Sequence, residues 1–467
     1  MPRYARLVHV SYAVITGILA VTTALFVPVD GDDPLRLFPW IAGASVAVIA
    51  SMIWMAGVWT ATGAYGLVFW CFHFGLIAVL ASGYVGVEDL SVWDLSWLLG
   101  PHAADASVLA LAGMLAWACG ASIVFLRRGQ QPSGGHAAPT ETAHSFGPIG
   151  SLMVLGAVAT WSLIVVATGG LTGFFVSYIQ YRQMTADLGP VLGVIWLVLG
   201  CGIVLSVSGR AGWLRTSAGI VFAALAVVAL PIGLRGEMMF RGVAALVAAA
   251  RCGRGLSTRN AIVLGVALLA IIPIVREVRL TGLSGLSNAV LEPRFYEGLA
   301  EMGASLHPVE KVVRWHAEGE PFERGGTYWA PIERAAARLL PGITVAAADD
   351  DSRITNVLVT DRVGAIGFSP VAEAYRNFGP LGVVAVLALL GAVMGAIDTI
   401  RDRRTAVLTL AMLYVPLLVN VRNSFVSVPA HCAAGLALIL ALAAIRHVLE
   451  SVVGRPYARP AYIRSQV

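Results

Sequence analysis

Apolar stretches long enough to cross a membrane recur along this chain, with short polar segments between them. Twelve such stretches are present, and most come close to the roughly 20 residues that a helix needs to span a bilayer. They cover residues 8–27, 37–57, 64–85, 107–126, 148–168, 191–208, 218–234, 235–250, 261–275, 381–397, 405–420 and 430–445. Each is predominantly apolar, whereas the strands of a membrane β-barrel alternate over about ten residues. The pattern predicts an all-α polytopic membrane protein with about 12 transmembrane helices.

One long polar segment, residues 276–378, interrupts this pattern between the ninth and tenth predicted helices. A Gly-, Pro-, Ser- and Thr-rich stretch at 127–147 predicts a flexible linker after the fourth helix. The predicted regions are a four-helix membrane region (1–126), the linker (127–147), helices 5–9 (148–275), a cap loop (276–378), helices 10–12 (379–447) and a basic tail (448–467).

The arginines predict the orientation. Only 13% of the 467 residues are charged, about half the proportion of a soluble domain. Arginines precede the first apolar stretch and follow the fourth, sixth, eighth, tenth and twelfth, so these clusters gather on one side of the membrane, which the positive-inside rule assigns to the cytoplasm. Both termini are then cytoplasmic and the 276–378 insertion faces outward. The net charge of +5 follows from this topology and does not suggest nucleic acid.

Several kinds of site are excluded or disfavoured. The chain has one lysine, Lys311, and it lies in no Gly-Lys-Ser/Thr sequence, so a P-loop ATPase is excluded. None of the five cysteines forms a CxxC pair, which argues against a disulfide framework or a zinc ribbon. His307 and His316 lie nine residues apart without an HExxH pattern, so no metal site and no cofactor are expected.

The first candidate site is Gly233 to Arg241, at the outer start of a predicted span. Arg235 lies at the membrane surface, where a guanidinium suits a lipid phosphate because it grips two oxygens in parallel. Snorkelling is the structural alternative. Arg241 lies six residues deeper, roughly 9 Å along a helix. It either serves the site or pairs locally with Glu237, four residues before it.

The second candidate is the run that re-enters the membrane after the insertion. Ser369-Pro370 predicts a helix start, and Gly379-Pro380 predicts its end. On that short helix Glu373, Arg376 and Asn377 share a face. A carboxylate held beside a guanidinium at the lipid surface can act as a general base. The structural alternative is a Glu373–Arg376 ion pair that fixes the turn.

Other polar residues lie in predicted outer segments and are weaker candidates. Each suits either a binding role or a simple anchor at the membrane interface. They are Arg422 in a short turn near His431, Arg182 beside Tyr178 and Tyr181, and Arg294 and His307 in the insertion.

The run from Gly367 to Pro380 (Gly-Phe-Ser-Pro-Val-Ala-Glu-Ala-Tyr-Arg-Asn-Phe-Gly-Pro), with the twelve-span layout and the large late outer loop, resembles bacterial O-antigen polymerases of the Wzy type. The Gly233 to Arg241 stretch is similar to a Gly-x-Arg found at the outer start of a span in the wider, GT-C-like group of O-antigen polymerases and ligases. Leu234 departs from the small residue expected before that arginine.

The resemblance implies polymerisation of undecaprenyl-diphosphate-linked oligosaccharide repeat units on the outer face of the bacterial cytoplasmic membrane, without metal or nucleotide. It implies that Arg235 and Arg241 hold the diphosphate, that Glu373 is the base, and that Tyr375, Arg376 and Asn377 line the site. It also implies membrane lipids, a flippase and a chain-length regulator as partners. An O-antigen ligase and a transporter or flippase stay open as alternatives, although no inverted repeat typical of transporters is present.

Overall fold

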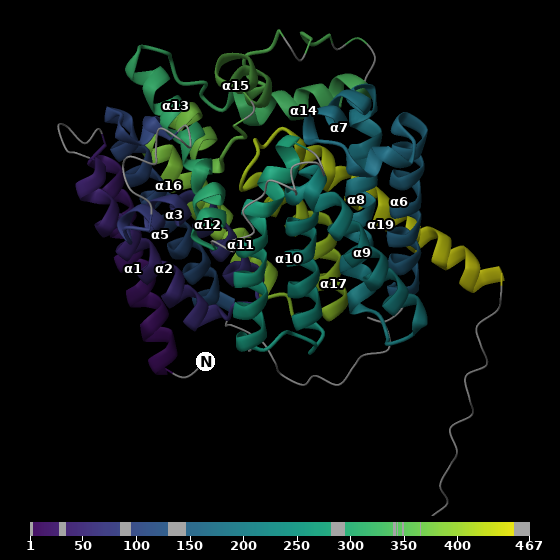
Figure 1. The fold of residues 1–467 in the computed structure, drawn as a ribbon. Coiled ribbons are helices and arrows are strands. Elements are labelled where there is room, and N and C mark those ends of the chain that lie inside the picture. Colours follow the sequence, from purple (N-terminus) through teal and green to yellow (C-terminus); the bar gives the residue numbers. More distant parts are fainter. Residues whose placement is uncertain are drawn as a thin grey trace, which may run out of the picture.

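The computed structural model describes residues 3–27, 34–84, 95–128, 146–281, 295–339, 342, 344–347, 350–364 and 366–452. Throughout these residues the ordered elements are helices, and no strand occurs in them. Most helices stand side by side as a bundle (Figure 1). The predicted class, an all-α polytopic membrane protein, is confirmed.

Nine helices within the described ranges are long and apolar enough to cross a membrane. They are α1 (Arg3–Leu25), α2 (Pro34–Ala56), α3 (Ala61–Ala81), α5 (Pro101–Arg128), α6 (Gly147–Gly169), α8 (Gly189–Ser208), α9 (Trp213–Ile232), α16 (Pro370–Asp398) and α19 (Ser427–Val452). The other three predicted spans coincide with helical segments that are not among these nine. These are α10 (Arg235–Arg251), α11 (Thr258–Thr281) and the succession of α17 (Arg403–Thr409), a π-helix (Leu410–Tyr414) and α18 (Val415–Asn420). Of α11, only Arg259–Ile272 qualifies as an apolar helix among the described residues. The count of twelve therefore stays a prediction.

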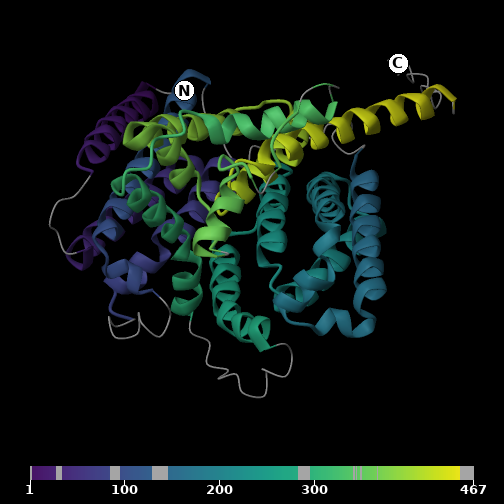
Figure 2. The ribbon, with the colours of Figure 1, turned by 90° about the horizontal axis from the view of Figure 1, so that it is seen from above.

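The bundle has two packing groups (Figure 2). In one, α1, α2, α3 and α5 pack together and against α16; in the other, α6, α8 and α9 enclose a separate apolar core around Trp161 and Trp196. Large apolar side chains point away from both groups, including Trp40, Leu163 and Val227. Such exposure is expected of surfaces that face lipid.

One end of the bundle, called the basic end here, is held together by polar contacts between helix termini. The Arg251 guanidinium donates to the carbonyl oxygens of Ile397 and Ile400, at 3.2 and 2.9 Å. The buried Asp398 carboxylate accepts from the backbone N–H groups of Ala61 and Thr62, both at 2.8 Å, which satisfies free donors at the start of α3. The last turn of α16 is thereby fixed to the first turn of α3.

The opposite end, the cap end, carries α13 (His307–Ala317), α14 (Gly326–Leu339) and α15 (Thr355–Val363), seen at the top of Figure 1. α7 (Tyr178–Met184) lies nearby. The polar insertion also enters the bundle, because α12 (Phe295–Gly303) packs against α3 and α11. A Cβ atom at Gly75 would lie 2.5 Å from the carbonyl oxygen of Leu299, and one at Gly303 would meet the backbone of Leu76. The two backbones approach closely because both positions are glycine.

Candidate functional site

The helix labelled α16 is two arms joined by a sharp reversal. Gly379, with φ 68° and ψ −162°, interrupts it, in a backbone region that is open essentially to glycine alone. A Cβ atom at Gly113 would contact both Val371 and Val383, at 3.6 and 3.2 Å. In a straight helix those two residues would lie about 18 Å apart. Residues 370–378, called the re-entrant helix here, therefore run back along the second arm, 380–398.

The re-entrant helix begins deep in the bundle. The Ser369 hydroxyl, which caps this helix by accepting from the N–H of Val371, lies 2.7 Å from Nε2 of His73. His73 is twelve residues into α3, or about 18 Å along a helix about 32 Å long. Because Nδ1 of His73 faces the carbonyl oxygen of Phe69 at 3.0 Å, Nδ1 carries the proton and Nε2 accepts from Ser369. The predicted helix start at Ser369-Pro370 is confirmed, and it lies near mid-bundle.

Glu373 lies one turn further along and is fully buried. The Thr327 hydroxyl, from α14, donates to its Oε1 at 2.9 Å, and the Phe425 backbone N–H donates to its Oε2 at 2.6 Å. The carboxylate thus joins the re-entrant helix to the cap and to the turn between α18 and α19. The helix spacing suggested an ion pair between Glu373 and Arg376, but within the described residues the two side chains bind other partners.

Arg376 instead binds the insertion. Its guanidinium is 2.9 Å from a carboxylate oxygen of Glu323 and 3.5 Å from one of Glu320, and its carbonyl oxygen accepts from the N–H of Glu323. It also lies 5.9 Å from the ring centre of Trp315. The Arg376 side chain is 4% exposed, so these partners offset the cost of burying its charge.

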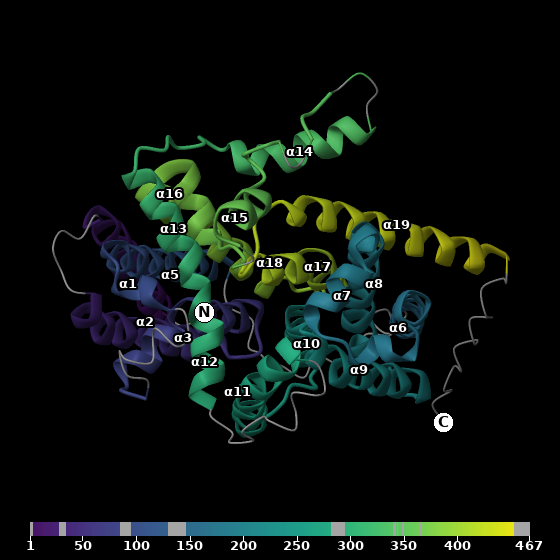
Figure 3. The same ribbon diagram turned by 45° about the horizontal axis from the view of Figure 1, so that its top comes forward.

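Asn377 and Tyr375 complete this junction. The Asn377 side-chain oxygen accepts from the N–H groups of Gly325 and Thr327, and its amide donates to the Thr327 hydroxyl at 2.7 Å. The ring centres of Tyr375 and His316 lie 5.5 Å apart, and Tyr375 is 8% exposed. Figure 3 shows α13 and α14 near the outer part of α16.

Arg422 lies beside the start of the re-entrant helix. Its carbonyl oxygen accepts from the N–H of Phe368 at 3.0 Å, and its guanidinium lies 5.9 Å from the ring centre of Phe72 on α3. Phe240, the neighbour of Arg241 on α10, packs 5.8 Å from the same ring. Phe72 is therefore the common contact of α10 and the Arg422 turn.

The two candidate arginines of α10, Arg235 and Arg241, are both paired. Arg235 lies 2.5 Å from a carboxylate oxygen of Glu301 on α12. Arg241 is 4% exposed and pairs with Glu237, so the predicted i,i+4 pair is confirmed. Its Nε also donates to the carbonyl oxygen of Trp196 at 2.7 Å. These contacts account for an arginine inside the bundle, which is otherwise costly.

The remaining candidates lie elsewhere. The Arg182 side chain is exposed on α7. His307 stacks on Trp97 with ring centres 4.6 Å apart, and burial, with the charges of Lys311 and Arg314, lowers the pKa of His307 to about 4. This histidine is therefore neutral near pH 7. Arg294 lies outside the described residues.

The sequence did not identify several residues that contact the candidate side chains directly but lie far from them along the chain. Glu301, Thr327, Glu320 and Glu323 lie in the insertion among many other polar residues, and nothing marks them in the sequence. His73 did carry a signal, because an ionisable side chain within an otherwise apolar span usually has a specific partner.

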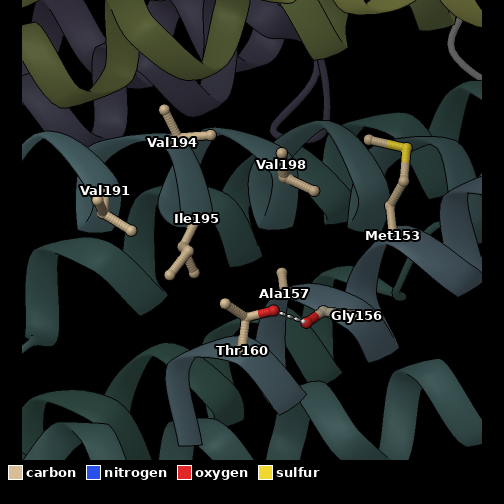
Figure 4. A pocket seen from close by; sticks show the side chains of 8 residues that line it. All are labelled: Met153, Gly156, Ala157, Thr160, Val191, Val194, Ile195 and Val198. Atoms are coloured by element: carbon tan, nitrogen blue, oxygen red, sulfur yellow. Dashed lines mark hydrogen bonds between the residues drawn. The ribbon is translucent and has the colours of Figure 1, made fainter. Parts of the chain in front are cut away.

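An apolar groove of about 470 Å³ lies between α6 and α8 (Figure 4). Valine, isoleucine and methionine side chains line it, and the Thr160 hydroxyl there donates to the carbonyl oxygen of Gly156. None of the candidate site residues borders this groove.

Fold and site together define a multi-pass membrane protein in which a re-entrant helix is clamped beneath a polar cap. The sequence profile of the O-antigen polysaccharide polymerase Wzy family matches residues 159–451, which is more than half of the chain and includes every candidate site residue. The chain belongs to this family.

A curated relative is Protein CapE of Staphylococcus aureus, to which the chain is 26% identical over 164 residues. That match covers 35% of this chain and 36% of CapE, so it spans about a third of the relative's length. No solved structure matches the chain.

Proposed function

We propose that this protein is a membrane glycosyltransferase that polymerises lipid-linked oligosaccharide repeat units into a surface polysaccharide. The family match over residues 159–451 carries this proposal. The donor is a glycan on undecaprenyl diphosphate and the acceptor is a sugar hydroxyl of another unit. The bond between the anomeric carbon and the diphosphate oxygen breaks, the acceptor oxygen bonds to that carbon, and its proton passes to a base.

Positive charge for the leaving diphosphate comes, in this proposal, from Arg235, Arg241 and Arg422. Preorganised charge at the leaving group is the main catalytic need of such a transfer, and no metal is required where guanidinium groups supply it. The packing of α10 and the Arg422 turn on Phe72 supports this grouping. The nearby first turn of the re-entrant helix contributes too, because the amino end of a helix favours anions. Glu237 and Glu301 hold two of these arginines until phosphate oxygens replace them.

Glu373 is the proposed base. Each of its carboxylate oxygens accepts one hydrogen bond here, which leaves lone pairs on both for an acceptor hydroxyl. Since the Glu373 side chain is fully buried, the acceptor sugar reaches its carboxylate when the cap and the turn between α18 and α19 move apart. Tyr375, Arg376 and Asn377 then line the acceptor side.

The proposed location is the bacterial cytoplasmic membrane, with the basic end and both termini in the cytoplasm and the cap end outside. Proposed partners are membrane lipids, a flippase that delivers the units and a chain-length regulator.

The experiment that tests the function is analysis of lipid-linked glycans in cells lacking the gene. Accumulated single units on the outer face are expected. Accumulated polymer would instead indicate a ligase, and units trapped inside would indicate a flippase. Complementation with Arg235→Ala or Glu373→Ala should also leave single units; normal polymer in both would contradict the assigned site.

A further inference from the structure

Thr327, near the start of α14, contacts both Glu373 and Asn377 of the re-entrant helix. Its hydroxyl donates to Oε1 of Glu373 at 2.9 Å and accepts from the Asn377 amide at 2.7 Å. Thr327 is fully buried. Its single donor is therefore used on the carboxylate, without competition from water.

Thr327 is itself held in place. The side-chain oxygen of Asn377 accepts from the N–H of Gly325 at 3.0 Å and from that of Thr327 at 3.3 Å, so it holds the first turn of α14. The N–H of Arg324 donates to the Asn377 carbonyl oxygen at 3.0 Å. The hydroxyl is thus presented to Glu373 from a fixed backbone.

The Glu373 carboxylate is held from two sides. Thr327 lies 46 residues before it and binds one oxygen, and Phe425 lies 52 residues after it and binds the other. Removing either donor leaves a single hydrogen bond, which fixes the orientation of the carboxylate less firmly. Because proton transfer needs the acceptor hydroxyl within about 3 Å and well aligned, the direction of the remaining lone pairs decides the rate.

We propose that Thr327 is a positioning residue, which orients the carboxylate of Glu373 for glycosyl transfer and couples the cap to the reaction. This inference rests on the proposed function, in which Glu373 is the base. Thr327 touches neither substrate and acts through Glu373.

The test compares Thr327→Val with Thr327→Ser in purified protein, using lipid-linked repeat units extracted from cells that lack the gene. Valine keeps the volume and removes the donor, whereas serine keeps the hydroxyl. Because a hydrogen bond to a charged group is lost, kcat should fall about tenfold or more in Thr327→Val, with KM within about twofold of wild type. Thr327→Ser should retain kcat within about twofold. If the valine variant fails to fold, Thr327→Cys replaces it, and its weak S–H donor should give a kcat below that of Thr327→Ser.

Wild-type kcat in Thr327→Val, or equal kcat in the serine and cysteine variants, would overturn the inference. So would a loss of kcat that is accompanied by a matching rise in KM and is not restored by serine, since that pattern belongs to a purely structural contact. Glu373→Gln separates the two proposals: full activity there removes the proposed role of Glu373, whereas an inactive Glu373→Gln beside an active Thr327→Val removes only that of Thr327.

Discussion

The reversal at Gly379 gives the sharpest structural prediction. Replacement by alanine forces a Cβ atom into a backbone conformation that costs of order 1–3 kcal/mol for a residue other than glycine. The new Cβ would lie 3.2 Å from the ring of Phe322, which is 43% exposed and can move aside. The backbone strain therefore dominates, and Gly379→Ala should lose about 1–3 kcal/mol of unfolding free energy.

The assay is unfolding of the purified protein in mixed micelles of increasing SDS content. Gly219→Ala is the matched control, because Gly219 lies within α9 and a Cβ atom there meets nothing within 4 Å. Replacing an exposed glycine within a helix by alanine raises the free energy of unfolding by up to about 1 kcal/mol. The control variant should therefore unfold at or above the SDS fraction at which the wild type unfolds. If Gly379→Ala unfolded together with wild type, the reversal between the two arms would be refuted.

Three further predictions concern the junctions and the chemistry. Glu373→Gln loses the charge but keeps an oxygen that accepts from the N–H of Phe425, and its amide NH2 can donate to the Thr327 hydroxyl, so that this contact reverses direction. Polymerisation should fall at least about a hundredfold with unfolding little changed, and a wild-type rate would exclude a base at this position. Asp398→Asn leaves one acceptor for two buried N–H groups at the start of α3, so it should destabilise the protein by about 1–3 kcal/mol in the same SDS assay; an unchanged transition would show that the contact contributes little. Polymer synthesis by purified protein should persist in EDTA, and a loss of activity that added Mg²⁺ restores would contradict the arginine-based mechanism.

Local patterns in the sequence were sufficient where the partners are neighbours along the chain. The apolar stretches predicted the membrane helices, and Ser369-Pro370 and Gly379-Pro380 predicted both ends of the re-entrant helix. The Glu237–Arg241 pair was predicted because i,i+4 spacing brings the two side chains together on one helix.

Tertiary partners could not be predicted in the same way. The i,i+3 spacing on one helix suggested an ion pair between Glu373 and Arg376. In the structure, Arg376 instead pairs with Glu320 and Glu323 of the insertion. Glu373 accepts a hydrogen bond from Thr327. These partners lie about 50 residues away, and their choice depends on how the cap folds over the bundle. The depth at which the re-entrant helix begins depends likewise on the contact of Ser369 with His73, which spans 296 residues.

The most direct test of the proposed polymerase activity is reconstitution. Purified protein in liposomes is supplied with single undecaprenyl-diphosphate-linked repeat units, and the products are separated by size. A polymerase should give a ladder of glycans that lengthens by one repeat unit at a time, with release of undecaprenyl diphosphate. Unchanged single units in the presence of folded protein would contradict it.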